Sequence, residues 1–176
     1  MHAKQGIAAS GIFLLTLGAS AWPATTEAAG VQVQFGVEGP AAGPFPSDLF
    51  TTPDPNQNTG LRVNLPKPDC TVRVTDCQTI DVLNTLDGFN LQPRLSIPFS
   101  APIDLNSVTS DTVFLLNLGS TLSGGNAGGQ IVGINQIVWD PDTNTLHVES
   151  DELLQQHTRY VLIVTRGVRD SNGHQL

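Results

Sequence analysis

The sequence is poor in basic residues and in cysteine, and both shortages exclude classes of function. Its 176 residues hold eight Lys and Arg against sixteen Asp and Glu, which gives a formal net charge of −8. Nucleic-acid binding needs cations that neutralise phosphates, so no nucleic-acid partner is expected. The only cysteines, Cys70 and Cys77, are too far apart for a C-x-x-C redox motif, and without nearby histidines they cannot complete a zinc site.

The motifs of common catalytic sites are also missing. An α/β-hydrolase carries its nucleophile in G-x-S-x-G, and the run Gly18-Ala19-Ser20-Ala21-Trp22 fails at its last position. The glycine-rich stretch Gly124–Gly129 lacks the Lys-Ser or Lys-Thr that follows in a phosphate loop. His147, His157 and His174 share no metal-binding spacing. The sequence therefore predicts no catalytic residue, no cofactor and no enzyme activity.

One apolar run lies at the N-terminus, and it has the order of a secretory signal peptide. Lys4 precedes the apolar stretch Ile7–Leu17, and Ala19-Ser20-Ala21 supplies small residues at a cleavage site. We expect a signal peptide over residues 1–21, with cleavage as late as residue 29 if Ala28-Ala29 is used. The run is too short to span a bilayer, and no transmembrane segment is expected once it is removed. The predicted location is extracytoplasmic, that is the periplasm, the cell surface or the medium.

Export favours a disulfide between the two cysteines. A close, even pair of cysteines in a secreted chain is most simply oxidised, so Cys70 and Cys77 are expected to close a short loop. Such a bond stabilises by about 2–3 kcal/mol and acts locally. It would lie in an extended N-terminal segment, residues 22–91, that is rich in Pro, Gly, Ala and Thr.

That segment contains two short elements by pattern. Residues 31–35 alternate apolar and polar side chains and predict one edge strand, and Phe45, Leu49 and Phe50 are expected to anchor the rest. One short helix is predicted between Thr75 and Gly88, with Asp76 or Thr79 at its start and Gly88 at its end. Its apolar positions are Val82 together with Ile80, Leu83 and Leu86.

From residue 92 onward the pattern predicts strands joined by turns. Strands are expected at 94–99, 111–116, 130–139, 143–150 and 158–166, because apolar side chains alternate and β-branched residues are frequent there. This favours an all-β fold, an Ig-like β-sandwich at 92–176 with an extended N-terminal arm and a short helix before the first core strand. The expected core residues are Leu95, Ile97, Phe99, Val113, Leu115, Ile137, Trp139, Tyr160, Leu162 and Val164.

The run from Asp140 to Asn144 allows two interpretations. Asp140, Asp142 and Asn144 begin as a calcium loop does, with oxygen ligands at alternate positions. However, Thr145 stands where that loop needs glycine, and Asp151 stands where it needs glutamate. Asp, Pro and Asn also suit a hairpin turn for reasons of backbone geometry. A turn is the preferred interpretation, and a weak calcium site is the alternative.

Two stretches of the strand-rich region resemble a known family. Leu95-Ser96-Ile97-Pro98-Phe99-Ser100-Ala101-Pro102-Ile103-Asp104 and the later run from His157 to Gly173 resemble the opening and closing strands of bacterial Ig-like domains of the S-layer and surface-protein type. The resemblance covers roughly residues 92–176. It implies a non-catalytic module, because such domains serve as spacers, adhesion units and appendages of enzymes.

The upstream region resembles a second group of proteins. Phe45-Pro46-Ser47-Asp48-Leu49-Phe50 and Asn84-Thr85-Leu86-Asp87-Gly88-Phe89 are similar to the N-terminal region of large secreted bacterial lipase-like proteins. There an Ig-like part precedes an α/β-hydrolase domain, and this sequence contains none, so a truncated or split member is implied. Whether the Ig-like domain is itself truncated at its C-terminus stays open.

Three functional hypotheses follow. The first is a non-catalytic extracytoplasmic module for cell-surface structure, adhesion or protein interaction, with a protein or cell-surface partner. The second is the accessory region of a secreted lipase or esterase, with a downstream hydrolase domain as partner. The third is a calcium-dependent binding module that uses Asp140, Asp142 and Asn144.

Overall fold

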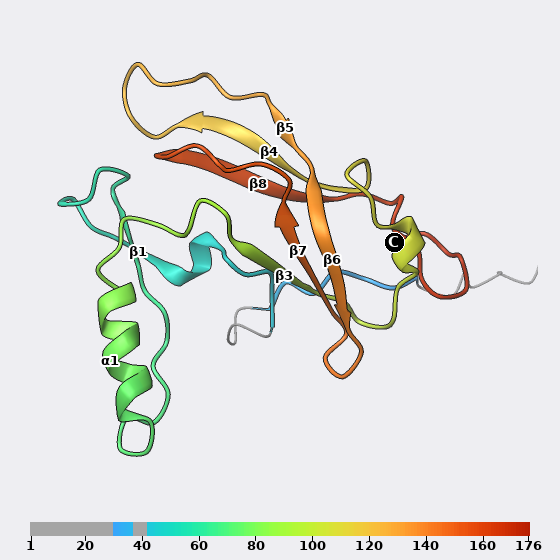
Figure 1. Ribbon diagram of the computed structural model, residues 1–176, viewed down its shortest axis with the longest axis horizontal. Coiled ribbons are helices and arrows are strands. Elements are labelled where there is room, and N and C mark those ends of the chain that lie inside the picture. The colour runs from blue at the N-terminus through green and yellow to red at the C-terminus, as the bar shows by residue number, and fades with distance from the viewer. Residues whose placement is uncertain (1–29, 37–41) are drawn as a thin grey trace, which may run out of the picture.

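The computed structural model describes residues 30–36 and 42–176, and the predicted signal peptide lies outside them. Two three-stranded antiparallel sheets face each other, with the strand orders β3-β7-β6 and β5-β4-β8. Figure 1 shows this sandwich, with the helix α1 standing apart from it. The sandwich strands are β3 (Arg94–Pro98), β4 (Val113–Ser120), β5 (Ile131–Val132), β6 (Ile134–Asp140), β7 (Thr145–Ser150) and β8 (Thr158–Val164).

The elements outside the sheets are short. A 3-10 turn η1 (Asp48–Phe50) leads into a two-stranded hairpin of β1 (Thr51–Pro53) and β2 (Leu61–Val63), which sequence patterns did not predict. The helix α1 (Val74–Leu83) follows, and a second 3-10 turn η2 (Leu105–Ser107) joins β3 to β4. The prediction of an all-β sandwich preceded by one short helix is confirmed.

Side-chain alternation explains why the sandwich strands form where they do. Leu95, Ile97 and Phe99 follow the period of two expected for a half-buried strand, and all three are buried. They meet Val113 and Leu115 of the other sheet in one hydrophobic cluster. The predicted core residues Trp139, Tyr160, Leu162 and Val164 are partly buried and pack against the same cluster.

The expectation that Ile137 belongs to the core is wrong. Strand β6 contains a β-bulge between Asn135 and Val138, where Gln136 has a φ of 48°. One extra residue in a strand reverses the alternation beyond it. The bulge therefore lets Ile134, before it, and Trp139, beyond it, both face the core, whereas Ile137 lies within the bulge and is 39% exposed.

The predicted helix is confirmed but its ends differ. It ends at Leu83, with Asn84 as its C-cap, so Gly88 lies beyond it. The N-cap is Arg73, which makes no side-chain capping bond, and Asp76 instead forms an ion pair with Arg73 at 2.5 Å. The preceding turn, closed by the bond from the Arg73 N–H to the Asp69 carbonyl at 2.9 Å, fixes the start. Among the apolar positions predicted for this helix, Val82, Leu83 and Leu86 are exposed.

Candidate interaction site

The residues suggested for calcium form a hairpin turn between β6 and β7. The carboxylate of Asp140 accepts the N–H of Asp142 at 3.0 Å and the hydroxyl of Thr143 at 2.8 Å. The hydrogen bond from the Thr143 hydroxyl, with that from the Asp142 N–H, lowers the pKa of Asp140. Asn144 takes a positive φ of 50°, as turn residues do. These contacts support the turn, and calcium binding stays a prediction.

Cys70 and Cys77 form the expected disulfide, which ties the loop before α1 to the first turns of the helix. The helix α1, which carries Cys77, stands away from the two sheets (Figure 1). Its place is consistent with a local structural role.

His147, His157 and His174 lie in separate places. His147 Nδ1 is 3.0 Å from the hydroxyl of Ser96, its cross-strand neighbour, and His174 Nδ1 is 2.9 Å from the carboxylate of Asp170. The His174 hydrogen bond lowers the pKa of Asp170. His157 lies in the turn before β8, with a φ of 49°. Within residues 30–36 and 42–176, no three His, Cys, Asp or Glu side chains form a group that could hold a metal ion.

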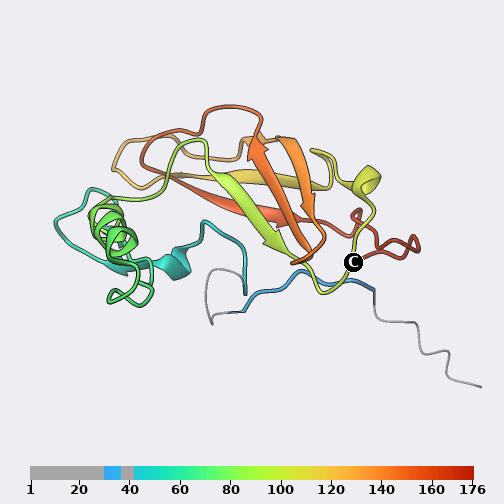
Figure 2. The same ribbon diagram turned by 60° about the horizontal axis from the view of Figure 1, so that its bottom comes forward.

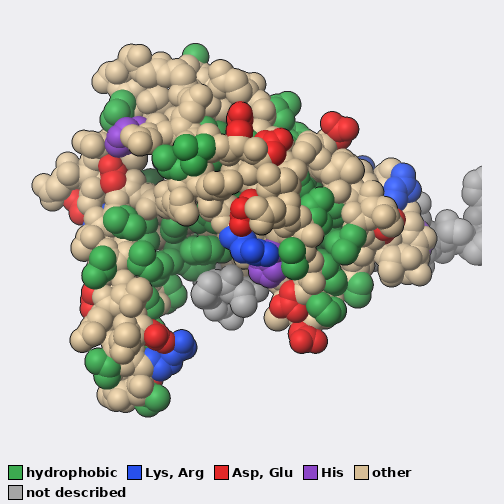
Figure 3. Space-filling model, in the orientation of Figure 1, with side chains coloured by type: hydrophobic (Ala, Val, Ile, Leu, Met, Phe, Trp, Pro, Cys, Tyr) green, Lys and Arg blue, Asp and Glu red, His purple; other side chains and the backbone are tan. Residues whose placement is uncertain are grey.

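A groove of about 690 Å³ runs between β8 and the N-terminal segment. One wall carries Tyr160, Leu162 and Val164 of β8, and the floor includes Leu95 and Leu115 of the sandwich core. In Figure 3, hydrophobic side chains gather between the sheet β5-β4-β8, at the top of the view, and the part of the chain that carries α1. The opposite wall is lined by Val33, Phe35, Pro44, Pro46, Leu61 and Phe89.

Pairing with β3 holds that opposite wall in place. Val33 forms an antiparallel bridge with Phe99, and Phe45 forms one with Ser96. The predicted strand at 31–35 is thus present as an extended stretch with a single bridge. Proline lacks the N–H that a ladder of hydrogen bonds needs. The segment contains Pro40, Pro44 and Pro46, and among its described residues the bridges are confined to Val33 and Phe45.

An aromatic cluster supports the same wall. The ring of Phe45 lies 5.5 Å from that of Phe50 and 5.6 Å from that of Phe89, both in edge-to-face geometry. The prediction that Phe45 and Phe50 anchor the segment is therefore confirmed. Leu49 does not anchor it, because the turn η1 directs this side chain outward and leaves it 59% exposed.

Charged side chains line one end of the groove, where β8 begins. Arg159 of β8 lies 3.7 Å from the carboxylate of Asp48, so an ion pair joins the two walls. Asp87 and His157 line the same end. Burial alone would raise the pKa of Asp87, but hydrogen bonds from Thr59 and Asn58 and the nearby His157 together lower it.

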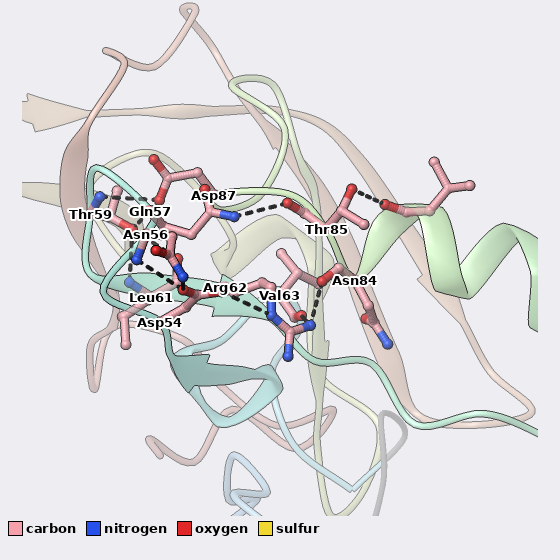
Figure 4. Close-up of polar contacts among 11 residues, drawn as sticks. Asp54, Asn56, Gln57, Thr59, Leu61, Arg62, Val63, Asn84, Thr85 and Asp87 are labelled. Carbon is pink, nitrogen blue, oxygen red and sulfur yellow. Dashed lines mark hydrogen bonds and ion pairs between the residues drawn. The ribbon is translucent and has the colours of Figure 1, made fainter.

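Asp87 also fastens the β1–β2 hairpin to the chain that follows α1 (Figure 4). Its carboxylate accepts the N–H of Asn58 at 3.0 Å, the N–H of Thr59 at 3.1 Å and the Thr59 hydroxyl. Nearby, the Gln57 amide donates to the Thr85 carbonyl at 3.0 Å, and Arg62 pairs with Asp54 at 3.4 Å. These contacts hold the wall that carries Leu61 and Phe89.

The sequence did not reveal the groove. Its two walls are far apart along the chain, and the alternation of β8 identifies a strand without showing which of its sides stays open. The sequence signals for this wall were Phe45 and Phe50, in the first stretch that resembles lipase-like proteins, and Phe89, in the second. Those stretches pack against each other in the fold.

Comparison with known proteins identifies the strand-rich region. The family model described as a bacterial Ig-like domain matches residues 76–176. No curated protein and no solved structure shows significant similarity to the chain. Across the part of the chain that the structure describes, no helix has the length and apolar character needed to cross a membrane.

Proposed function

Because the chain belongs to the bacterial Ig-like domain family, we propose that it is a non-catalytic extracytoplasmic module that binds another polypeptide. The observation that carries the proposal is the apolar groove of about 690 Å³ between β8 and the N-terminal segment. Bacterial Ig-like domains are typically extracellular or surface-exposed, and the predicted signal peptide agrees with that location.

The chemistry of the groove favours binding over turnover. Its walls and floor are mostly aliphatic and aromatic side chains, with the ion pair Asp48–Arg159 and the carboxylate of Asp87 at one end. Apolar concave surfaces with a few charged groups at the rim suit a protein partner. The Ser96–His147 pair lies outside this lining, on neighbouring strands of the other sheet, so it does not supply a nucleophile to the groove.

The proposal can be tested with the full oxidised chain. Peptides selected from a random display library should bind with affinities measurable by calorimetry. The variant Leu162→Asp places a charge in the groove and should weaken binding about tenfold or more, because burying an unpaired charge is costly. The matched control Leu118→Asp alters an exposed residue outside the groove and should bind as the wild type does.

Two results would contradict this function. One is that no peptide is selected, or that the selected peptides bind both variants equally. The other is reproducible hydrolysis of short-chain p-nitrophenyl esters by the purified chain, since that would establish catalysis.

The second candidate is the accessory region of a secreted lipase or esterase. The observation that favours it is that the two stretches resembling lipase-like proteins meet at the groove, where Phe45 and Phe89 are 5.6 Å apart. A partner hydrolase would then dock there. Expression of the chain with a G-x-S-x-G hydrolase encoded beside it should give a complex on size-exclusion chromatography, which Leu162→Asp disrupts and Leu118→Asp does not.

A further inference from the structure

The backbone of β8 offers hydrogen bonds on the side that faces away from β4. In an antiparallel pair, the N–H and C=O of alternate residues point to the neighbouring strand. At one end of β8, the Thr165 N–H donates to the Thr112 carbonyl at 2.8 Å, and at the other end the His157 carbonyl accepts the Thr121 N–H at 2.7 Å. The backbone N–H and C=O groups of odd-numbered residues in β8 therefore point to β4. Those of Tyr160, Leu162 and Val164 point away from β4.

Within residues 30–36 and 42–176, β8 pairs with β4 alone, and no hydrogen bond is made by the N–H groups of Tyr160, Leu162 and Val164. The corresponding edge of the other sheet is covered. There, Phe45 exchanges both backbone hydrogen bonds with Ser96 of β3, at 2.8 and 3.0 Å, and Gln34 donates to Pro98 at 2.8 Å. The two sheets thus differ at the groove: the N-terminal segment covers the edge of β3, and the edge of β8 is open.

The open edge also lacks the features that protect edge strands. Natural edges are blunted by proline, lysine, bulges or inward-pointing charges. Strand β8 reads Thr-Arg-Tyr-Val-Leu-Ile-Val, with Arg159 near one end as its sole charge. The register irregularity of this pair lies on β4, between Asn117 and Gly119, and leaves β8 regular. An unprotected apolar edge beside an apolar groove is suited to receive another strand.

We propose that the groove accepts an extended strand of a partner polypeptide, which pairs with the open edge of β8 and lays alternate apolar side chains over Leu95 and Leu115. This inference rests on the proposed function and names the form of its partner. Charge complementarity adds one property to that strand. Asp48 and Asp87 outnumber Arg159 at the Thr158 end of the groove, so the partner should carry Lys or Arg there, and the net charge of −8 would favour its approach.

The test uses a peptide selected for binding to the full oxidised chain, synthesised in two forms. One form is N-methylated at its odd-numbered residues, and the other form is N-methylated at its even-numbered residues. Only one set of N–H groups can face β8 in a strand, so one form should lose about tenfold or more in affinity and the other should keep it. Binding should require a lysine or arginine at one end of the peptide, and replacing that residue by glutamate should weaken binding.

Two measurements on the protein complete the test. Leu162→Pro removes an N–H that points away from β4, and Leu162→Ala is its matched control because it shortens the same side chain but keeps the N–H. Proline should weaken binding well beyond alanine. On binding of the unmodified peptide, amide exchange should slow at Tyr160, Leu162 and Val164, whereas Val161 and Ile163, already directed to β4, serve as internal controls.

The outcomes separate this inference from the function on which it rests. If both N-methylated forms bind equally while Leu162→Asp still weakens binding, strand addition is wrong but the groove remains a polypeptide site. If no peptide binds, both proposals fail. If the chain forms a dimer that Leu162→Pro converts to monomer and peptides do not compete, the occupant is a second copy and not a partner strand.

Discussion

Phe45 and Ser96 exchange both of their backbone hydrogen bonds, with N···O distances of 3.0 Å and 2.8 Å. This single antiparallel bridge joins the N-terminal segment to β3 and so fixes one wall of the groove (Figure 2 shows the two segments from a second direction). The stability of that wall should depend on the aromatic ring that Phe45 places against Phe50 and Phe89.

The first prediction concerns that ring. Phe45→Ala removes two edge-to-face contacts and partly buried apolar area, and it should lower the free energy of unfolding by about 2–3 kcal/mol. Chemical denaturation followed by circular dichroism measures the change. Phe35→Ala is the control, because Phe35 is 73% exposed and its loss should cost about 0.5 kcal/mol or less. Equal losses in the two variants would contradict an anchoring role for Phe45.

The second prediction concerns the carboxylate of Asp87 and its pH dependence. Its pKa is lowered in the folded state, so its stabilising effect is present above the ordinary value of about 3.9 and is lost as the pH falls through the folded value. The amide protons of Asn58 and Thr59 donate to this carboxylate, so their protection factors, which correct for the intrinsic pH dependence of exchange, should be high at pH 6 and fall under acid conditions. NMR detects this change directly.

Asp87→Asn supplies the comparison for that experiment. It should lower stability by about 1 kcal/mol near neutral pH, since hydrogen bonds to a charged acceptor are replaced by weaker ones, and the difference from wild type should shrink in acid. Asp81→Asn is the control, because Asp81 pairs with Lys67 outside this network. A difference that grows on acidification would contradict the assignment.

The third prediction distinguishes the turn at Asp140 from a calcium site. Asp140→Ala removes the acceptor for Asp142 and Thr143, so it should lower the melting temperature equally in calcium and in chelator. Asp142→Ala should have a smaller effect in both buffers. Thermal melts of the oxidised chain measure this, and destabilisation seen only with calcium present would restore the metal interpretation.

The fourth prediction follows from the β-bulge in β6. Ile134→Ala should cost about 2–4 kcal/mol, because Ile134 is 7% exposed and lies in the core cluster. Ile137→Ala should cost about 0.5 kcal/mol or less, because the bulge directs this residue to the surface. Urea denaturation compares them, and a larger loss at Ile137 would place the bulge elsewhere.

The fifth prediction concerns the disulfide. Replacing Cys70 and Cys77 by serine should reduce stability by about 2–3 kcal/mol in the region of α1, because a short covalent loop no longer restricts the unfolded chain. Amide exchange should quicken in α1 and remain slow in β4 and β7, which are held by the two sheets. Loss of protection in β7 together with α1 would show that the disulfide supports the sandwich as well.

Local patterns in the sequence were sufficient to determine the class of fold. Alternation at Leu95, Ile97 and Phe99 identifies a half-buried strand, since side chains of a strand point to opposite faces in turn. The Asp140–Asn144 run identifies a turn, because its side chains bond their own backbone. Both are properties of neighbouring residues, so they can be recognised before any long-range contact is known.

Only the tertiary structure decided which surface forms the groove. The bulge at Gln136 moves Ile137 outward because pairing with β7 sets the register, and the pattern of β6 by itself does not contain that register. Likewise, nothing in the sequence of β8 states that one edge meets β4 and the other a groove. That arrangement arises because Phe45 pairs with β3 and Val33 pairs with Phe99, directly after β3, from far along the chain. Such long-range pairing is settled only when the whole fold forms.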